Sequence, residues 1–126
     1  MPHYEEMKIE EFEKVLNERK NLNRIRIKGR SFISVSLRDI NFDNMQLNNC
    51  LFSDCSFPHK ISNCNFYNCT IACSDLKFVE FDDCGFACTD IIEVSLMDNK
   101  FTECDFDLVN LNGDNISLGD DINDFF

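Results

Sequence analysis

The sequence predicts an all-β solenoid, in which the chain coils through short extended steps and a helix covers the first coil. Three observations support this fold class. A bulky apolar residue recurs every five positions, a small residue recurs two positions before it, and only the N-terminal segment has helical spacing. A period of five fits neither an amphipathic helix nor an alternating strand. The chain is therefore a repeat protein.

The bulky apolar residues follow one register that breaks once. The first run, spaced by five, is Leu22, Ile27, Phe32, Leu37, Phe42, Leu47, Phe52 and Phe57. After a step of four, the second run is Ile61, Phe66, Ile71, Leu76, Phe81, Phe86, Ile91, Leu96, Phe101, Phe106, Leu111 and Ile116. Spacing sustained over this length indicates one structural unit repeated along most of the chain.

A small or modestly apolar companion stands two positions before most of these residues. The companions are Val35, Ile40, Met45, Cys50, Cys55, Cys64, Cys69, Ser74, Val79, Cys84, Thr89, Val94, Cys104 and Val109. Residues two apart in extended backbone project to the same side, so each bulky residue and its companion should point inward. The other three positions hold mostly polar residues that turn a chain. Each unit is therefore a short step followed by a corner.

The lag at which the chemistry repeats predicts the number of sides. At a lag of twenty, Phe66, Phe86 and Phe106 align. At a lag of fifteen, Phe66 would instead meet Phe81 and then Leu96. Four sides per coil is the better interpretation, with stacked steps paired as parallel strands about 4.8 Å apart.

Several stretches have a small residue, then Asp or Asn, then Leu or Phe, as in Cys64–Phe66, Ser74–Leu76 and Cys104–Phe106. This pattern resembles that of the pentapeptide repeat proteins, and the resemblance extends over residues 22 to 118. It implies a right-handed quadrilateral parallel β-helix of pentapeptide repeats. It implies much less about function, because one fold can serve many functions.

The shortened step falls at Pro58–Lys60. A proline cannot donate to a strand ladder, so it suits a corner or a bulge. We expect a local irregularity here. A binding loop is the alternative, although functional loops are usually longer insertions.

The two ends should cap the stack, because a stack of parallel strands leaves unpaired edges. We expect a helical cap over residues 1–20, a β-helix over 21–118 and a C-terminal tail over 119–126. The apolar residues at helical spacing in the cap are Ile9, Phe12, Val15 and Leu16. Those that we expect at the C-terminal end, either folded over the last coil or in a homodimer contact, are Leu118, Ile122, Phe125 and Phe126. The homodimer through this end is the preferred interpretation.

A basic run follows the cap and consists of Arg24, Arg26, Lys28 and Arg30. Alternation places these side chains outward, opposite Ile25 and Ile27. They could bind phosphate, but pairing with acids of the helix or of a second molecule is the simpler expectation.

Six of the eight cysteines, all except Cys73 and Cys88, occupy the inward companion position. A small hydrophobe is wanted there, and free cysteine is among the most buried residues. Their spacing follows the repeat rather than a zinc motif. We expect free thiols in the core, with a metal site and disulfides as the less favoured alternatives, and no cofactor.

Charge is distributed unevenly along the chain. Residues 1–30 hold 8 Lys and Arg against 6 Asp and Glu (8 − 6 = +2), whereas residues 31–126 hold 4 against 17 (4 − 17 = −13). Such a field repels nucleic acid and attracts basic partners. The candidate interaction surface is the acidic set Asp82, Asp83, Asp98, Glu103, Asp105 and Asp107. The alternative is a solvated surface that only prevents aggregation.

Composition excludes several classes of protein. At 126 residues the chain fits one domain. Its apolar runs are too short to span a bilayer, and its N-terminus has no signal-peptide pattern, so we expect a soluble cytoplasmic protein. The only histidines are His3 and His59, and the carboxylates follow outward positions instead of converging. We therefore expect a protein that is not an enzyme.

Two binding functions remain. The first is an interaction or scaffold module that contacts an unknown protein through flat faces and exposed Tyr67, Phe78, Ile92 and Met97. The second follows from the resemblance, since some pentapeptide repeat proteins are dimeric acidic rods that mimic DNA and act on DNA gyrase or topoisomerase IV. The chain is short and lacks the long inserted loop of some of those proteins. Direct binding of nucleic acid or membrane is not expected.

Overall fold

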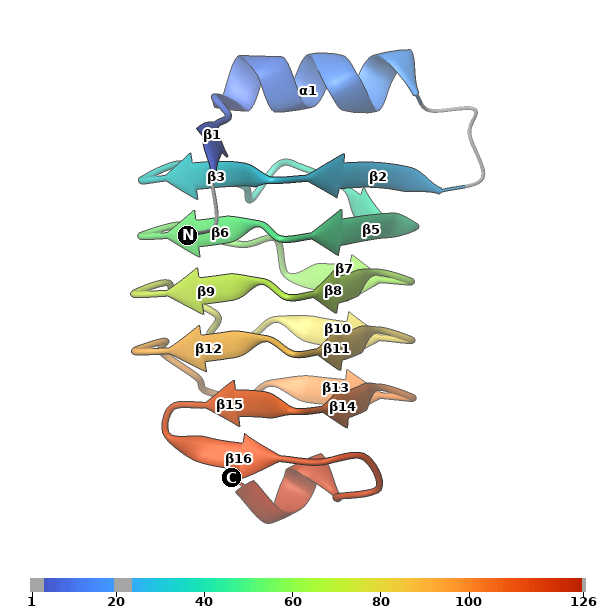
Figure 1. Ribbon diagram of the computed structural model, residues 1–126, viewed down its shortest axis with the longest axis vertical. Coiled ribbons are helices and arrows are strands. Elements are labelled where there is room, and N and C mark those ends of the chain that lie inside the picture. Colours follow the sequence, from blue (N-terminus) through green and yellow to red (C-terminus); the bar gives the residue numbers. More distant parts are fainter. Residues whose placement is uncertain (1–3, 20–23, 126) are drawn as a thin grey trace.

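The computed structural model describes residues 4–19 and 24–125, without the side chains of 123 and 124, and has the predicted solenoid fold (Figure 1). His3, Leu22 and Phe126, which the sequence singled out, lie outside the described residues. Short parallel strands stack in register beneath one helix. The near strands run from right to left as the coil descends, so the coil is right-handed.

Three sides of the coil are sheets, numbered here in the order in which the coil that begins at residue 42 passes through them. The first sheet contains β4 (Phe42–Asp43), β7 (Lys60–Ser62), β10 (Glu80–Asp82) and β13 (Lys100–Thr102). The second contains β2 (Ile25–Lys28), β5 (Met45–Asn48), β8 (Asn65–Tyr67), β11 (Gly85–Ala87) and β14 (Asp105–Asp107). The third contains β3 (Arg30–Ile33), β6 (Leu51–Ser53), β9 (Thr70–Ala72), β12 (Asp90–Ile92) and β15 (Val109–Leu111). Single bridges that join Ser36, Ser56, Asp75 and Ser95 form the fourth side. Four sides per coil are thus confirmed.

Register follows the predicted lag, apart from the coil that contains Pro58. Phe86 is paired with Phe66 and Phe106, each twenty positions away. Phe42 is instead paired with Ile61, nineteen positions away. This coil is therefore one residue shorter than the others and continues without an inserted loop. Pro58 is buried within it.

Left-handed residues make the corners. Most stand two positions after a bulky core residue, including Asn68 (φ 52°), Asp83 (φ 55°) and Leu108 (φ 55°). None of the non-glycine residues with positive φ is Val, Ile or Thr, whose branched side chains suit this region least. The Asn and Asp residues among them have short side chains that tolerate this conformation.

Stacked rings fill the interior. Phe66, Phe86 and Phe106 form one column, with centroids 4.9 and 5.0 Å apart and ring planes within 3°. Phe32 and Phe52 stack in the same way at 4.7 Å. Parallel in-register strands bring identical side chains to the same height in successive coils, so flat rings pack face to face.

The N-terminal cap contains a helix, as predicted, and a strand that was not. Helix α1 (Ile9–Glu18) buries Phe12 completely, against the rings of Phe32 (5.0 Å) and Phe42 (5.9 Å). The preceding strand β1 (Glu5–Glu6) pairs in parallel with β3. The described helices include none with the length and apolar character needed to cross a membrane.

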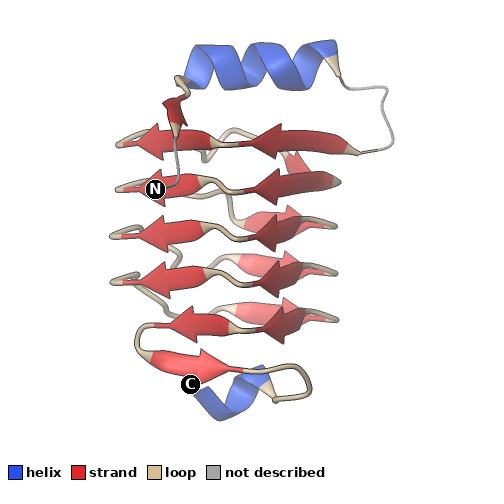
Figure 2. Cartoon of the chain, in the orientation of Figure 1, coloured by secondary structure: helices blue, strands red, loops and turns tan. Residues whose placement is uncertain are grey.

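The C-terminal end departs from the repeat earlier than expected. The sequence register continued to Ile116, but β16 (Asp114–Ile116) turns back and pairs with β15 in antiparallel orientation (Figure 2). Ile116 is nevertheless buried, and the 3₁₀ helix η1 (Ile122–Phe125) follows beneath the last coil. The end of the stack is thus covered by the chain itself.

Candidate interaction surfaces

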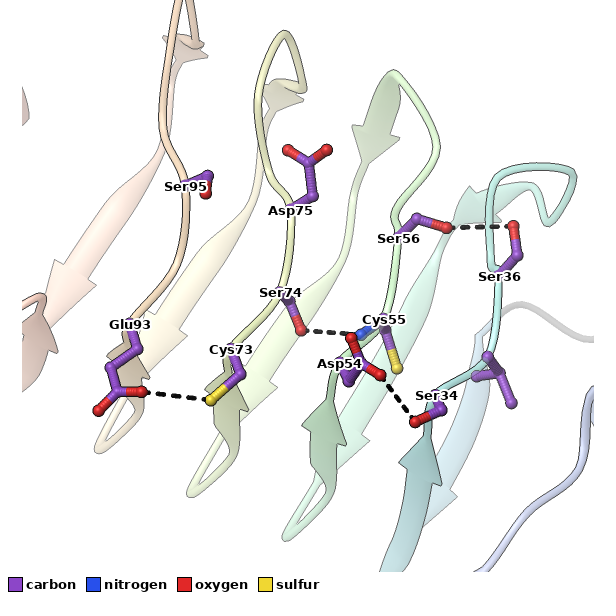
Figure 3. Close-up of a pocket in the computed structure, with 11 residues that line it drawn as sticks. Ser34, Ser36, Asp54, Cys55, Ser56, Cys73, Ser74, Asp75, Glu93 and Ser95 are labelled. Carbon is purple, nitrogen blue, oxygen red and sulfur yellow. Dashed lines mark hydrogen bonds between the residues drawn. The ribbon is translucent and has the colours of Figure 1, made fainter.

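A groove of about 620 Å³ follows the corner between the third sheet and the fourth side (Figure 3). Its walls come from successive coils, so chemically similar side chains repeat along it. The hydroxyl-bearing residues are Ser34, Ser36, Ser56, Ser74 and Ser95, and the acidic residues are Asp54, Asp75 and Glu93. Sequence reasoning missed this groove, although small outward residues at lags of about twenty were the available signal.

The polar groups of the groove mostly bond to one another across coils. Ser34 Oγ donates to Asp54 Oδ2 at 2.8 Å, and Ser56 Oγ lies 3.1 Å from Ser36 Oγ. These contacts form ladders between coils. The groove therefore resembles a structural seam more than a site with unsatisfied groups.

The groove does not activate a nucleophile. Cys73 Sγ donates to Glu93 Oε2 at 3.4 Å, and this hydrogen bond raises the pKa of the Cys73 thiol. The thiol is therefore held in its protonated, weakly nucleophilic form. The described lining residues include no histidine, lysine or arginine that could act as a base or bind an oxyanion. Among described residues, no group of three or more His, Cys, Asp or Glu could hold a metal ion.

The predicted acidic set is divided by the fold. Asp82, Asp83, Glu103 and Asp105 lie along the corner between the first and second sheets, in two successive coils. Asp107 lies at the far edge of the second sheet, and Asp98 lies at the opposite corner of the first sheet. Among described residues, none of these six carboxylates makes an ion pair or accepts a side-chain hydrogen bond.

The exposed apolar residues named from the sequence also separate. Tyr67 (54% exposed) lies on the second sheet, whereas Phe78 and Met97 lie in adjacent coils between the fourth side and the first sheet. Phe78 N donates to Met97 O at 2.8 Å. Ile92 is half-buried on the third sheet. Of these four apolar residues, Phe78 and Met97 thus lie nearest to an acid of the set, beside Asp98.

The basic run serves two purposes. Arg30 pairs with Glu11 of the helix, and Arg24 Nη1 lies 3.3 Å from Met45 O and 3.4 Å from Asn63 O. Arg26 and Lys28 point outward from β2 and are exposed. The expectation of pairing with an acid of the helix is confirmed for Arg30.

The tail places most of its apolar side chains against its own chain. Ile122 is only 8% exposed, and Phe125 packs partly against the core. Leu118 is 70% exposed. Within the described tail, Leu118 therefore has the most surface left for a partner.

The companion cysteines lie where the sequence placed them. Cys50, Cys55, Cys64, Cys69 and Cys84 are buried free thiols, Cys104 in the last coil is half-buried, and Cys73 and Cys88 are exposed. Cys84 Sγ donates to Ile61 O of the preceding coil at 3.3 Å. Burial raises the pKa of Cys64 to about 11 and also raises the pKa of Cys55.

Comparison with known proteins adds no relative from which a function could be transferred. No family model matches the chain, and no curated protein matches its sequence.

Proposed function

We propose that this chain is a non-enzymatic protein-interaction module of the pentapeptide-repeat type, which acts in the cytoplasm. The observation that carries the proposal is the corner of Asp82, Asp83, Glu103 and Asp105, whose carboxylates have no cationic partner within the described chain. Crowded like charges cost stability, so a basic partner that neutralises them gains binding energy. Eight free thiols suit a reducing compartment.

The shape of the molecule supports binding over catalysis. In the described part of the chain, core side chains fill the interior of the coil, where an enclosed substrate cavity would have to lie, whereas flat sides and a rigid corner hold outward side chains at fixed spacing. At the other edge of the first sheet, Phe78 and Met97 lie beside Asp98 and supply exposed apolar surface for a partner. A partner that spans the first sheet would meet acids at both edges and apolar side chains at one.

The test compares proteins captured from a host lysate by wild type and by Asp82→Asn, Asp83→Asn, Asp98→Asn. Asparagine keeps the size of the side chain and tolerates the left-handed backbone of residues 83 and 98. The matched control is Asp39→Asn, Asp43→Asn, Asp54→Asn, which also removes three acids, all of them in earlier coils. A basic protein retained by wild type and control, but lost with the variant and at high salt, supports the proposal. Identical retention by all three contradicts it.

The second candidate is mimicry of DNA toward gyrase or topoisomerase IV. What favours it is the run of Asp82, Asp83, Glu103 and Asp105 along one corner, since closely spaced charges also characterise a duplex. Length opposes it. The five-stranded second sheet spans about 20 Å between its end strands, the length of roughly six base pairs.

Gyrase supercoiling tests this alternative. The six acids of the predicted set are replaced by Asn or Gln, and wild type and variant are compared at low and moderate salt. Inhibition or protection by wild type that weakens with salt and disappears in the variant supports mimicry. No effect of wild type, or equal potency of both proteins, leaves the interaction module as the function.

A further inference from the structure

The outer face of the second sheet carries two columns of side chains that change character from the first coil to the last. The pairs, in order, are Arg26 and Lys28 on β2, Gln46 and Asn48 on β5, Asn65 and Tyr67 on β8, Gly85 and Ala87 on β11, and Asp105 and Asp107 on β14. Both columns pass from cations through larger polar side chains and then small residues to carboxylates. The face is therefore charged oppositely at its two ends.

The charges at both ends are unused within the chain. Arg26, Lys28 and Asp105 are exposed, and Asp107 is half-buried. Among the described residues, none of the four makes a side-chain hydrogen bond or an ion pair. Their neighbours Arg24 and Arg30, in contrast, are held by backbone carbonyls and a carboxylate. The exposed pairs therefore remain available to a partner.

Side-chain size is also uneven across the face. A depression of about 560 Å³ extends from Gln46 and Asn48 to Asp105 and Asp107, and its lining includes the small residues Gly85 and Ala87. The Asn65 amide lies over Gly85, since a Cβ on residue 85 would lie 2.7 Å from Asn65 Oδ1. On the other side of β8, the larger side chains of Gln46 and Asn48 are joined by a 3.4 Å hydrogen bond.

We propose that this face docks onto the same face of a second copy of the chain, around a two-fold axis that runs parallel to β8. Such an axis reverses the order of strands and keeps each column aligned with itself. Arg26 then faces Asp105 of the second copy, and Lys28 faces its Asp107. Every charge at one end of the face meets the opposite charge.

The same rotation matches side-chain size. Gln46 and Asn48 of one copy face the small residues Gly85 and Ala87 of the other, and the two Tyr67 rings meet at the axis. A two-fold axis parallel to the coil axis would instead exchange the two columns and place Arg26 against Lys28 and Asp105 against Asp107 of the second copy, which like-charge repulsion disfavours. Only one of the two symmetric face-to-face arrangements is thus complementary in both charge and size.

The contact is small. Five strands, in each of which the two columns span three residues, give a face of about 20 by 10 Å, less than the roughly 800 Å² per partner of a standard interface. A weak dimer that depends on charge is therefore expected, populated at high protein concentration and low ionic strength. This self-association shares only Asp105 with the acidic corner proposed to bind a basic partner, and the test of that corner uses acids outside the face.

Sedimentation velocity over a range of concentrations at low and moderate salt tests the proposal. Wild type should show a monomer–dimer equilibrium that weakens with salt. The variants Arg26→Glu, Lys28→Glu and Asp105→Lys, Asp107→Lys should each lose at least about tenfold in association constant, because both symmetric contacts become repulsive. Thermal unfolding of each variant by circular dichroism confirms that the fold is retained.

The decisive sample is an equimolar mixture of the two variants. One then has four acids on its face and the other four bases, so the mixture should form a heterodimer although neither variant associates alone. Leu118→Ser, at the C-terminal end, should dimerise like wild type. Monomeric wild type at high concentration and low salt would overturn the proposal. So would a mixture that stays monomeric, or a dimer that only Leu118→Ser abolishes, which would place the contact at the tail.

Discussion

Arg30 and Glu11 form an ion pair, with 2.8 Å between Nη2 and Oε1, that joins the capping helix to the first coil. The same guanidinium donates to the carbonyl oxygens of Glu5 and Glu6, at 3.0 Å each. The Arg30 side chain is 18% exposed, so these bonds are largely shielded from water. One residue of β3 thus holds both β1 and α1 in place.

Replacement of Arg30 by Met should lower the free energy of unfolding by about 2 to 3 kcal/mol, because three charge-assisted hydrogen bonds are lost together. Urea denaturation measures the change. Glu11→Gln should cost less than about 1 kcal/mol, since this carboxylate is half exposed. Arg26→Met is the matched control and should change little. A loss as large for Arg26→Met as for Arg30→Met would show that the cap does not depend on these contacts.

The Phe66, Phe86 and Phe106 column makes Phe86→Ala one of the most damaging substitutions. Phe86 is 3% exposed and stacks on a ring above and a ring below. We expect a loss of about 3 to 5 kcal/mol, because paired strands on three sides of the coil prevent collapse of the cavity. Phe78→Ala, at a position 49% exposed, should cost far less. Equal losses in urea denaturation would contradict the inward and outward assignments.

Most of the solenoid could be predicted from the sequence because its register is local. Core residues recur every five positions, so the position of one predicts the positions of the next. Parallel pairing then brings residues about twenty positions apart into contact. The same logic placed Cys64 and Cys84 inside and Cys73 and Cys88 outside. It also showed where one coil would be shortened, at Pro58.

The features that escaped prediction depend on contacts between distant segments or on a single turn. β1 contains only two exposed glutamates and is defined by its pairing with β3. The reversal before β16 retains the spacing from Leu111 to Ile116, so periodicity alone could not reveal it. The signal was the dipeptide Asn112–Gly113, whose positive φ values of 49° and 98° fit a two-residue hairpin turn. The groove exists only because serines of separate coils come together.

Left-handed corners that carry unsuitable residues should be sites where stability can be gained. Leu108 has φ 55° and is 66% exposed, so it bears backbone strain with little burial in return. Leu108→Asn should raise the free energy of unfolding by about 0.5 to 1 kcal/mol, measured by urea denaturation at moderate salt. Met97→Asn is the control, because Met97 is similarly exposed but has no positive φ. Equal changes in the two variants would exclude backbone strain as the cause.

The buried thiols should resist modification. A thiol-specific reagent at neutral pH should label Cys73 and Cys88 rapidly, while the five buried cysteines react only on unfolding. Mass spectrometry after a short exposure distinguishes the two groups. Rapid labelling of Cys64 or Cys84 in the folded protein would mean that the coils open locally.

The raised thiol pKa values should make stability fall in alkaline solution. Burial raises the pKa of Cys64 from 9.0 to about 11, so between these values the unfolded chain loses a proton that the folded chain keeps. The stabilisation is therefore complete below pH 9 and disappears progressively toward pH 11. For Cys64 alone it amounts to roughly 2 to 3 kcal/mol. Urea denaturation of wild type and Cys64→Val from pH 7 to 11 isolates this contribution. The variant should lose less stability than wild type over that range, and parallel pH profiles would show that Cys64 is not protected from ionisation.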